Sequence, residues 1–348
     1  MLQCLRFLRK QHQNGKYYFS NETSVSKETE SKIIQKDPNA EEEEPSASPK
    51  TTTKSKNKTD IETENQYTIN YNGKLTEKVA KEFIVEDSEN QKDNNTDEIE
   101  EVENKFIKKY SITAANLLEM DPDFAEGLTE VFKKIYKEYP EAEGYLTNIT
   151  LWNTSLSDKG IIAAYQPLFL FADVNTSYGE ALIFKMRVLL SARYFLNESK
   201  MEKEIKSCEK QGWFPENCDI YSAVSHELGH YLSFLAMMKE YGVDSTLILT
   251  EENNDVMIEL ANDFSEGTFS LEMIEEAYKN YKKDYDTDED IDEWRGHISG
   301  YALAQDNEGE YIYDETIAEA FHDVYLNGDD AAIQSQYIVE VLKERLRK

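Results

Sequence analysis

The chain has 348 residues, of which 39% are hydrophobic, and it carries 69 acidic against 38 basic side chains, a net charge of −31. An acidic excess of this size repels phosphate backbones, so we expect no nucleic-acid partner. The longest apolar stretch, 161–172, is interrupted by Gln166 and Pro167 and is too short to span a bilayer, which predicts no membrane association. The N-terminus lacks the continuous apolar core of a secretory signal, and this leaves the localisation open.

The first part of the chain has the composition of a disordered region. Residues 1–104 are mostly polar and of low complexity, with the acidic run Glu41–Glu44 and few large apolar side chains. Such a segment buries too little apolar surface to offset the loss of chain entropy. We therefore expect disorder over 1–104 and one folded domain over 105–348, with order beginning near 102–106. The short patch Tyr67–Tyr71 could form a strand with a partner, but a disordered tail is the simpler interpretation.

The folded part predicts strands first and helices afterwards. Asp121 and Pro122 have the positions of a helix cap and a first-turn proline, and apolar side chains at helical spacing follow up to Pro140. We expect strands at 149–153 and 161–172, a strand or a helix at 182–191, a helix at 198–210 and a loop at 212–217. From Asp219 the pattern is helical almost to the end. This order predicts an α+β domain with a small sheet and a helical C-terminal part.

The cysteine count gives little sign of a disulfide framework. The three cysteines are Cys4, Cys208 and Cys218, an odd and sparse set. Cys208 and Cys218 could pair, but we expect two free thiols.

Residues 224–232, V-S-H-E-L-G-H-Y-L, have the pattern of a metal-binding helix. His226 and His230 are four positions apart, so they lie on one helix face, one turn from each other, and can reach one ion. Glu227, next to the first histidine, can take a proton from a water molecule that the metal acidifies. Gly229 is costly in mid-helix, by about 1 kcal/mol relative to alanine, and its missing side chain would let another element approach closely.

A catalytic zinc needs a third protein ligand and an open position, and two downstream carboxylate pairs compete for that role. Glu259 and Asp263 form an E-x-x-x-D pattern, and Glu315 and Glu319 form an E-x-x-x-E pattern. On either helix, one carboxylate could bind the metal and the next could hold a ligand histidine. Spacing alone does not choose between the two pairs. His322, on the same expected helix as Glu315, is a further alternative ligand.

Three motifs occur in an order that resembles a known family. S-H-E-L-G-H at 225–230, S-G-Y-A at 299–302 and E-T-I-A-E-A-F at 315–321 are similar to the lethal-factor-like zincin metallopeptidase domain. The similarity is greater to the C-terminal domain of phage minor capsid (head) proteins, which also have a G-W-[HF]-P loop, here G-W-F-P at 212–215. The resemblance covers about residues 105–345.

The resemblance implies roles for single residues. His226, His230 and Glu315 would bind Zn²⁺, Glu227 would be the general base, and the Tyr301 hydroxyl would stabilise the oxyanion, as in a gluzincin-like site. The chain departs from the family pattern at 305–314, where the family has only a short link, and this bears most on the placement of Tyr301. The substrate would lie extended along an edge strand beside the metal helix, with 161–172 and 182–191 as candidates.

The sequence thus predicts a zinc metalloendopeptidase that hydrolyses peptide bonds in protein or peptide substrates. The alternative is a virion structural protein with a non-catalytic zincin-like domain, whose partners would be phage head proteins. A secreted toxin-like effector is a third possibility. The intact H-E-x-x-H favours catalysis, because a purely structural site has no use for Glu227. The localisation stays open, with a virion-associated and a cytoplasmic protein as the two possibilities.

Overall fold

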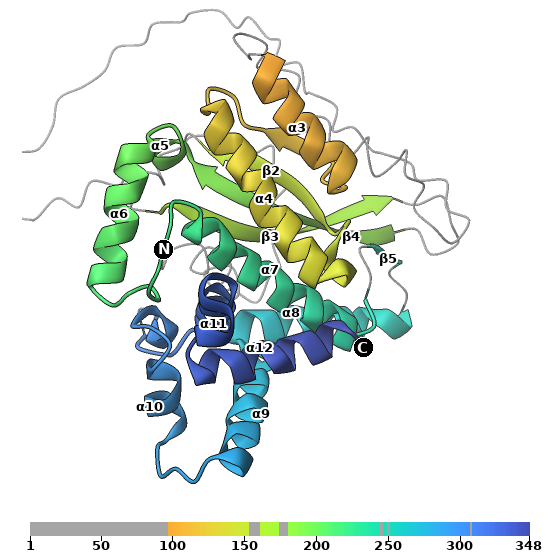
Figure 1. Ribbon diagram of the computed structural model, residues 1–348. Coiled ribbons are helices and arrows are strands. Elements are labelled where there is room, and N and C mark those ends of the chain that lie inside the picture. The colour runs from red at the N-terminus through yellow and green to blue at the C-terminus, as the bar shows by residue number, and fades with distance from the viewer. Residues whose placement is uncertain (1–96, 153–160, 174–179, 244–245, 249–250, 307) are drawn as a thin grey trace, which may run out of the picture.

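The computed structural model describes residues 97–348, apart from 153–160, 174–179, 244–245, 249–250 and 307 (Figure 1). The expectations for residues 1–96, including the patch Tyr67–Tyr71, lie outside the described residues. Residues 97–104 were expected to be disordered but belong to helix α3 (Asp97–Lys109). Ile99, Val102 and Phe106 of this helix are buried, so one apolar stripe begins earlier than the sequence suggested.

Helix α4 (Pro122–Glu138) has the predicted start and end. The Asp121 side chain accepts hydrogen bonds from the backbone N–H groups of Asp123 and Phe124, at 3.0 and 3.2 Å, and Pro122 occupies the first turn. The apolar face of α4 is buried in the core, as the helical spacing predicts: Phe124, Leu128, Val131, Phe132 and Ile135.

The strands form one mixed sheet of order β1-β2-β4-β3, with β5 also paired to β4. The strands are β1 (Ala114–Asn116), β2 (Leu146–Trp152), β3 (Ala163–Asp173), β4 (Glu180–Ser191) and β5 (Thr246–Ile248). β1, β2 and β4 are parallel neighbours, whereas β3 and β5 run antiparallel to β4. The predicted α+β class is therefore confirmed, and the ambiguous segment 182–191 is a strand.

The sheet decides which of the two candidate strands lies at an edge. β4 pairs with β2, β3 and β5, so it is central, and the expectation that 182–191 could be the edge is wrong. β3 pairs with β4 alone in the part of the chain that the structure describes, so 161–172 supplies an edge strand. β3 also packs beside helix α7 (Ser222–Glu240).

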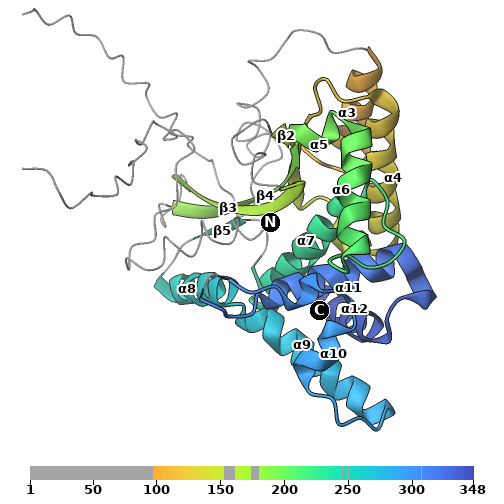
Figure 2. The same cartoon turned by 90° about the vertical axis from the view of Figure 1, so that its left-hand side faces the viewer.

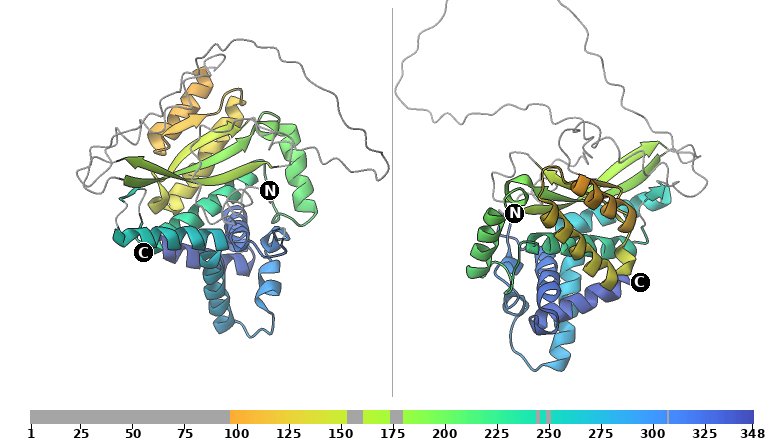
Figure 3. Two further views of the ribbon diagram at one scale, coloured as in Figure 1. Left: turned by 180° about the vertical axis from the view of Figure 1, so that it is seen from behind. Right: turned by 45° about the horizontal axis from the view of Figure 1, so that its top comes forward.

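The helices that cover the sheet gather on one of its faces, where α3 and α4 pack against each other and α7 lies beside the C-terminal helices (Figures 1 and 2). The alternating β4 residues Met186, Val188 and Leu190 join one core with α4 and α7, whereas Leu189 belongs to a separate small cluster. The bounds of the remaining helices are α5 (Ala192–Phe195), α6 (Glu198–Lys210), α8 (Glu251–Glu266), α9 (Thr268–Asp284), α10 (Ile291–Gly296), α11 (Tyr313–Asn327) and α12 (Ile333–Leu346). α9 and α10 form a protrusion that points away from the sheet, as the view from behind also shows (Figure 3). No described helix is both long and apolar enough to cross a membrane.

The metal motif lies in the most buried helix of the domain. α7 is surrounded by β3, β4, α8, α11 and α12, and its residues 222–238 are all buried. Gly229 lies where α11 comes very close to α7. A Cβ added there would lie 2.8 Å from Ala318 Cα and 3.1 Å from the Ala318 carbonyl oxygen. The glycine therefore allows the close approach that the sequence predicted, and it brings the two motif-bearing helices together.

Gly229→Ala is expected to destabilise the protein. Alanine adds about 1 kcal/mol of helix propensity, but its methyl group would meet the Ala318 backbone, which a rotamer change cannot relieve. Pushing α7 and α11 apart should cost more than this gain, with a net loss of about 1–3 kcal/mol. Urea unfolding should show a lower midpoint with an unchanged slope. A midpoint at or above that of the wild type would mean that the helices are not held at this distance.

Candidate metal centre

His226 and His230 lie one turn apart on α7, and both side chains are buried. Their Nε2 atoms are 3.2 Å apart, with the two rings nearly perpendicular at 84°. Two nitrogens bound to one tetrahedral ion at about 2.0 Å each would lie about 3.3 Å apart. The helix therefore presents the two imidazoles at the separation that a single metal ion needs.

Glu315, in the first turn of α11, completes a triangle with the two histidines. Its Oε2 lies 3.2 Å from His226 Nε2 and 3.3 Å from His230 Nε2. This oxygen is buried and accepts no hydrogen bond from the described residues. A buried carboxylate oxygen without a donor is costly unless a cation faces it. The three atoms could thus hold a metal ion, and their nearly equal separations fit the base of a tetrahedral site.

A second group of possible ligands, His226, Glu319 and His322, fits a metal less well. His226 Nδ1 is 2.7 Å from Glu319 Oε1, whereas His322 Nδ1 is 3.9 Å from the same oxygen. The first pair of atoms is close but not aligned as a hydrogen bond, and the second distance is long for two ligands of one tetrahedral ion. The His322 ring also faces the edge of the Phe214 ring and lies 3.9 Å from Cys218 Sγ. Geometry therefore favours Glu315 over His322 as the third ligand.

Each histidine has a carboxylate at its other ring nitrogen. Glu319 faces His226 Nδ1, and Ser299 Oγ donates to the other oxygen of Glu319 at 2.8 Å. Asp314 Oδ2 lies 2.6 Å from His230 Nδ1, and Ser233 Oγ donates to Asp314 Oδ1 at 2.6 Å. Such partners fix the ring orientation and make the ligand nitrogen more basic. The E-x-x-x-E pattern predicted the role of Glu319, but sequence reasoning missed Asp314.

The carboxylates dominate the electrostatics of the site. Burial lowers the pKa of His226, but Glu315 and Glu319 outweigh it and raise the pKa to about 10. Burial likewise opposes the charges of Asp314 and Glu315, which hold the pKa of His230 well above its ordinary value. Burial raises the pKa of Glu315, but the two histidines more than reverse this and keep it well below its usual range. Without a metal, the carboxylates therefore favour an extra proton on this histidine pair near neutral pH.

Binding of a divalent metal near pH 7 is expected to release protons. A metal ligand nitrogen must be free of its proton, and the raised pKa values of His226 and His230 favour an extra proton on the histidine pair before binding. The number of protons released per bound metal ion should be largest well below pH 10. It should fall as the pH rises through about 10, the pKa of His226, because this ring then loses its extra proton before the metal binds. Calorimetry in buffers of different ionisation enthalpy measures it. Binding without proton release at pH 7 would contradict this charge state.

Glu227 lies between the metal helix and the edge strand. Its Oε2 accepts a hydrogen bond of 2.6 Å from the backbone N–H of Tyr165 in β3. The bond fixes one carboxylate oxygen and ties the H-E-x-x-H helix to the strand. Ile162 C=O accepts a hydrogen bond from Ser191 N–H, so the backbone groups of Ile162 face β4. The backbone groups of successive residues alternate between the two sides of a strand, and Tyr165, three residues later, therefore directs its N–H away from β4. Pro167 is two residues after Tyr165, so its backbone nitrogen also points away from β4. A sheet tolerates proline at such a position, because no hydrogen bond to the neighbouring strand is lost.

Tyr301 lies at the candidate metal centre. It opens the short 3₁₀ helix η4 (Tyr301–Leu303), and its hydroxyl donates to Glu315 Oε1 at 3.2 Å. Burial raises the pKa of the phenol well above its ordinary value, and the charges of Glu315 and Glu227 add to this, so it keeps its proton. The preceding Gly300 N–H donates to Gly212 C=O at 2.6 Å. The G-W-F-P loop and the S-G-Y-A segment, which are distant in sequence, are thereby in contact.

The other candidates of the sequence lie elsewhere. Glu259 is exposed on α8 and belongs to neither ligand group, so its candidacy as the third ligand is wrong. Asp263 accepts a hydrogen bond from the Tyr241 hydroxyl. Asp263 thus meets the C-terminal end of α7 at Tyr241 rather than the histidines of that helix. Cys208 and Cys218 are free thiols, as expected.

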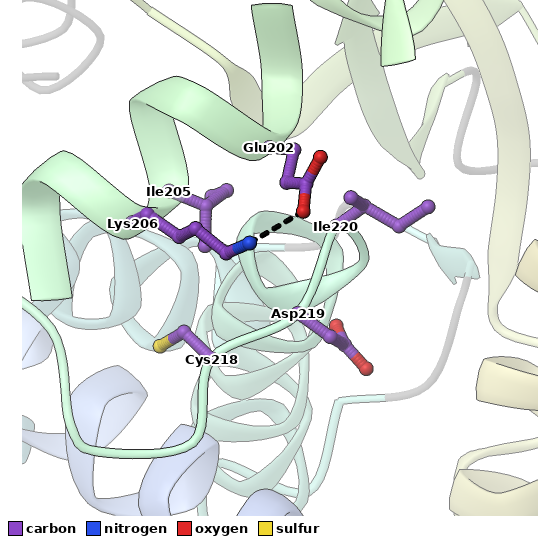
Figure 4. A pocket seen from close by; sticks show the side chains of 6 residues that line it. All are labelled: Glu202, Ile205, Lys206, Cys218, Asp219 and Ile220. Carbon is purple, nitrogen blue, oxygen red and sulfur yellow. Dashed lines mark hydrogen bonds and ion pairs between the residues drawn. The ribbon is translucent and has the colours of Figure 1, made fainter. Parts of the chain in front are cut away.

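A separate hollow of about 260 Å³ lies beside α6 (Figure 4). It is lined by Glu202, Ile205, Lys206, Cys218, Asp219 and Ile220. Glu202 and Lys206 form an ion pair within this lining. None of the three metal-ligand candidates takes part in it.

No protein-family model, curated protein or solved structure matches this chain.

Proposed function

We propose that the protein is a zinc-dependent endopeptidase, with His226, His230 and Glu315 as zinc ligands and Glu227 as the general base. The observation that carries the proposal is the triangle of two imidazole nitrogens and one carboxylate oxygen, with sides of 3.2, 3.2 and 3.3 Å. Zn²⁺ prefers four ligands of this kind at about 2.0–2.2 Å. The motif resemblance to lethal-factor-like zincins supports the same assignment.

Zinc, when bound, would polarise the scissile carbonyl group and lower the pKa of a water molecule to about 7. Glu227 is next to the first ligand histidine and is nearly buried, so its carboxylate can take the proton from that water. The hydrogen bond from Tyr165 N–H holds Glu227 Oε2 in place before the reaction. Less conformational entropy is therefore lost when the carboxylate is oriented towards the water molecule. Glu227 would then pass the proton to the leaving amine.

Tyr301 supplies a neutral donor near the developing negative charge. Its hydroxyl proton is retained because burial and nearby carboxylates raise the pKa of the phenol. In the absence of substrate this proton is directed to Glu315 Oε1. If the Tyr301 hydroxyl turned to a substrate oxyanion, it would donate a preorganised hydrogen bond to it. Removal of such a donor usually lowers kcat by about 10²–10³-fold.

The substrate would be an extended peptide added to the outer edge of β3. This strand is an edge of the described sheet and lies against α7 through Tyr165 and Glu227. Strand addition uses main-chain hydrogen bonds, so it suits a protein or peptide substrate of varied sequence.

Metal analysis and a broad peptide-library cleavage assay on the purified protein test this proposal. We expect zinc bound in a one-to-one ratio and cleavage that a chelator abolishes and added zinc restores. A zinc-loaded protein that cleaves nothing would contradict the endopeptidase proposal. It would favour the alternative of a virion structural protein with a non-catalytic zincin-like domain.

A further inference from the structure

Arg295 is a completely buried cation close to the metal centre. It lies in α10, and its Nε donates to Asp292 Oδ1 at 2.9 Å. The Asp292 side chain is 41% exposed, so this pair is only partly shielded from solvent. A buried arginine is costly to desolvate, and an ion pair with a half-exposed carboxylate offsets little of that cost. The burial of this charge therefore calls for a reason beyond stability.

The inner end of Arg295 joins the two segments that carry Tyr301 and Glu315. Its Nη1 donates to Thr316 Oγ1 at 2.9 Å and to the Ala302 carbonyl oxygen at 3.3 Å. Thr316 Oγ1 donates in turn to the same Ala302 oxygen at 2.6 Å. Ala302 directly follows Tyr301, and Thr316 directly follows Glu315. This three-atom junction thus sets the distance between the η4 turn and the first turn of α11.

The stretch 305–314, which departs from the family pattern, encloses the same arginine. The Arg295 guanidinium carbon lies 4.1 Å from the Tyr311 ring centroid and 4.9 Å from that of Tyr313, within the range of cation–π attraction. A bridge between Gln305 and Tyr311 closes the stretch into a hairpin-like turn. The extra residues therefore supply the aromatic walls of the Arg295 site.

We propose that Arg295, acting through Thr316, is a positioning residue that fixes the Tyr301 hydroxyl relative to Glu315 and hence to the metal. The inference rests on the proposed function, in which Tyr301 donates to the oxyanion. The hydroxyl now lies 3.2 Å from Glu315 Oε1. Loss of the junction would let the η4 turn shift relative to α11, and a displacement of about 1 Å at a reacting group can cost about 10²-fold in rate.

The matched variants Thr316→Val and Thr316→Ser test the junction. Valine keeps the shape but removes the hydroxyl, so we expect a fall in kcat of about 10- to 100-fold, with KM and zinc content nearly unchanged. Serine keeps the hydroxyl and should restore kcat to near the wild-type value. Glu293→Gln, an exposed change on the same helix that does not contact Arg295, should leave kcat unchanged. Equal kcat values for Thr316→Val and the wild type would overturn the proposal.

Two further measurements separate positioning from general destabilisation. In a Tyr301→Phe background, Thr316→Val should have almost no further effect on kcat, because its effect passes through the missing hydroxyl. Amide hydrogen exchange of Thr316→Val should increase at residues 300–304 but not in α7. Full additivity of the two substitutions, or unchanged exchange at 300–304, would overturn the proposal. A zinc-loaded wild type without peptidase activity would refute the proposed function, and the exchange result would still decide the positioning role.

Discussion

Glu227→Gln is expected to abolish peptide hydrolysis while the fold and the metal remain. Glutamine has the size of glutamate, and its amide oxygen can still accept the hydrogen bond from Tyr165 N–H. It cannot take a proton from water, however, and a positioned general base contributes about 10²–10⁴ to the rate. We expect kcat to fall by that factor with KM nearly unchanged. Zinc content by elemental analysis and kinetics on one library-derived peptide measure both parts.

Glu240→Gln is the matched control for this experiment. Glu240 ends the same helix, and its carboxylate pairs with Lys348 at the surface. The same chemical change there should leave both zinc content and kcat at the wild-type level. Activity that survives Glu227→Gln would point to a contaminating protease, and loss of zinc from Glu227→Gln would mean that Glu227 binds the metal.

Glu315→Ala is expected to destroy the metal centre. The substitution removes one of three proposed ligands and the main counter-charge between His226 and His230. Loss of an outer hydrogen-bond partner of a metal ligand typically costs 10- to 100-fold in metal affinity, so loss of a ligand should cost more than about 100-fold. Competition with a chromophoric chelator measures the affinity, and circular dichroism establishes that the helices remain.

The exposed Glu259 provides the comparison for Glu315→Ala. Glu259→Ala should bind zinc like the wild type, because this side chain lies on the surface of α8 and in neither ligand group. The reverse pattern, with affinity lost in Glu259→Ala and kept in Glu315→Ala, would transfer the ligand role to Glu259.

Local chemistry made part of this structure predictable from sequence. Asp121 and Pro122 marked the start of α4 because a cap and a first-turn proline act within one helical turn. The spacing of His226 and His230 placed their rings together for the same reason, since one turn of helix separates them. Gly229 signalled the close approach of another helix, although it could not reveal that Ala318 lies there.

The remaining features depend on contacts between distant segments. The choice of Glu315 over Glu259 required knowledge of which helix faces α7, and only the resemblance suggested it. Asp314 reaches His230 across 84 residues, and no short pattern joins the two. Segment 182–191 is apolar enough for a strand or a helix, and its pairing with β2, β3 and β5 decided for the strand. Contacts between distant segments thus determined the third ligand candidate, the partner of His230 and the secondary structure of 182–191, which the local sequence pattern did not determine.

The outer edge of β3 has a consequence for self-association. An open strand edge invites pairing with a second copy of the same chain, which leads to aggregation. Here Tyr165 N–H is occupied by Glu227, and Pro167 has no N–H to offer. Two successive outward donors are therefore missing from this edge of the described sheet. Two copies placed edge to edge along this stretch would both lack these donors, so the edge resists polymerisation into a continuous sheet.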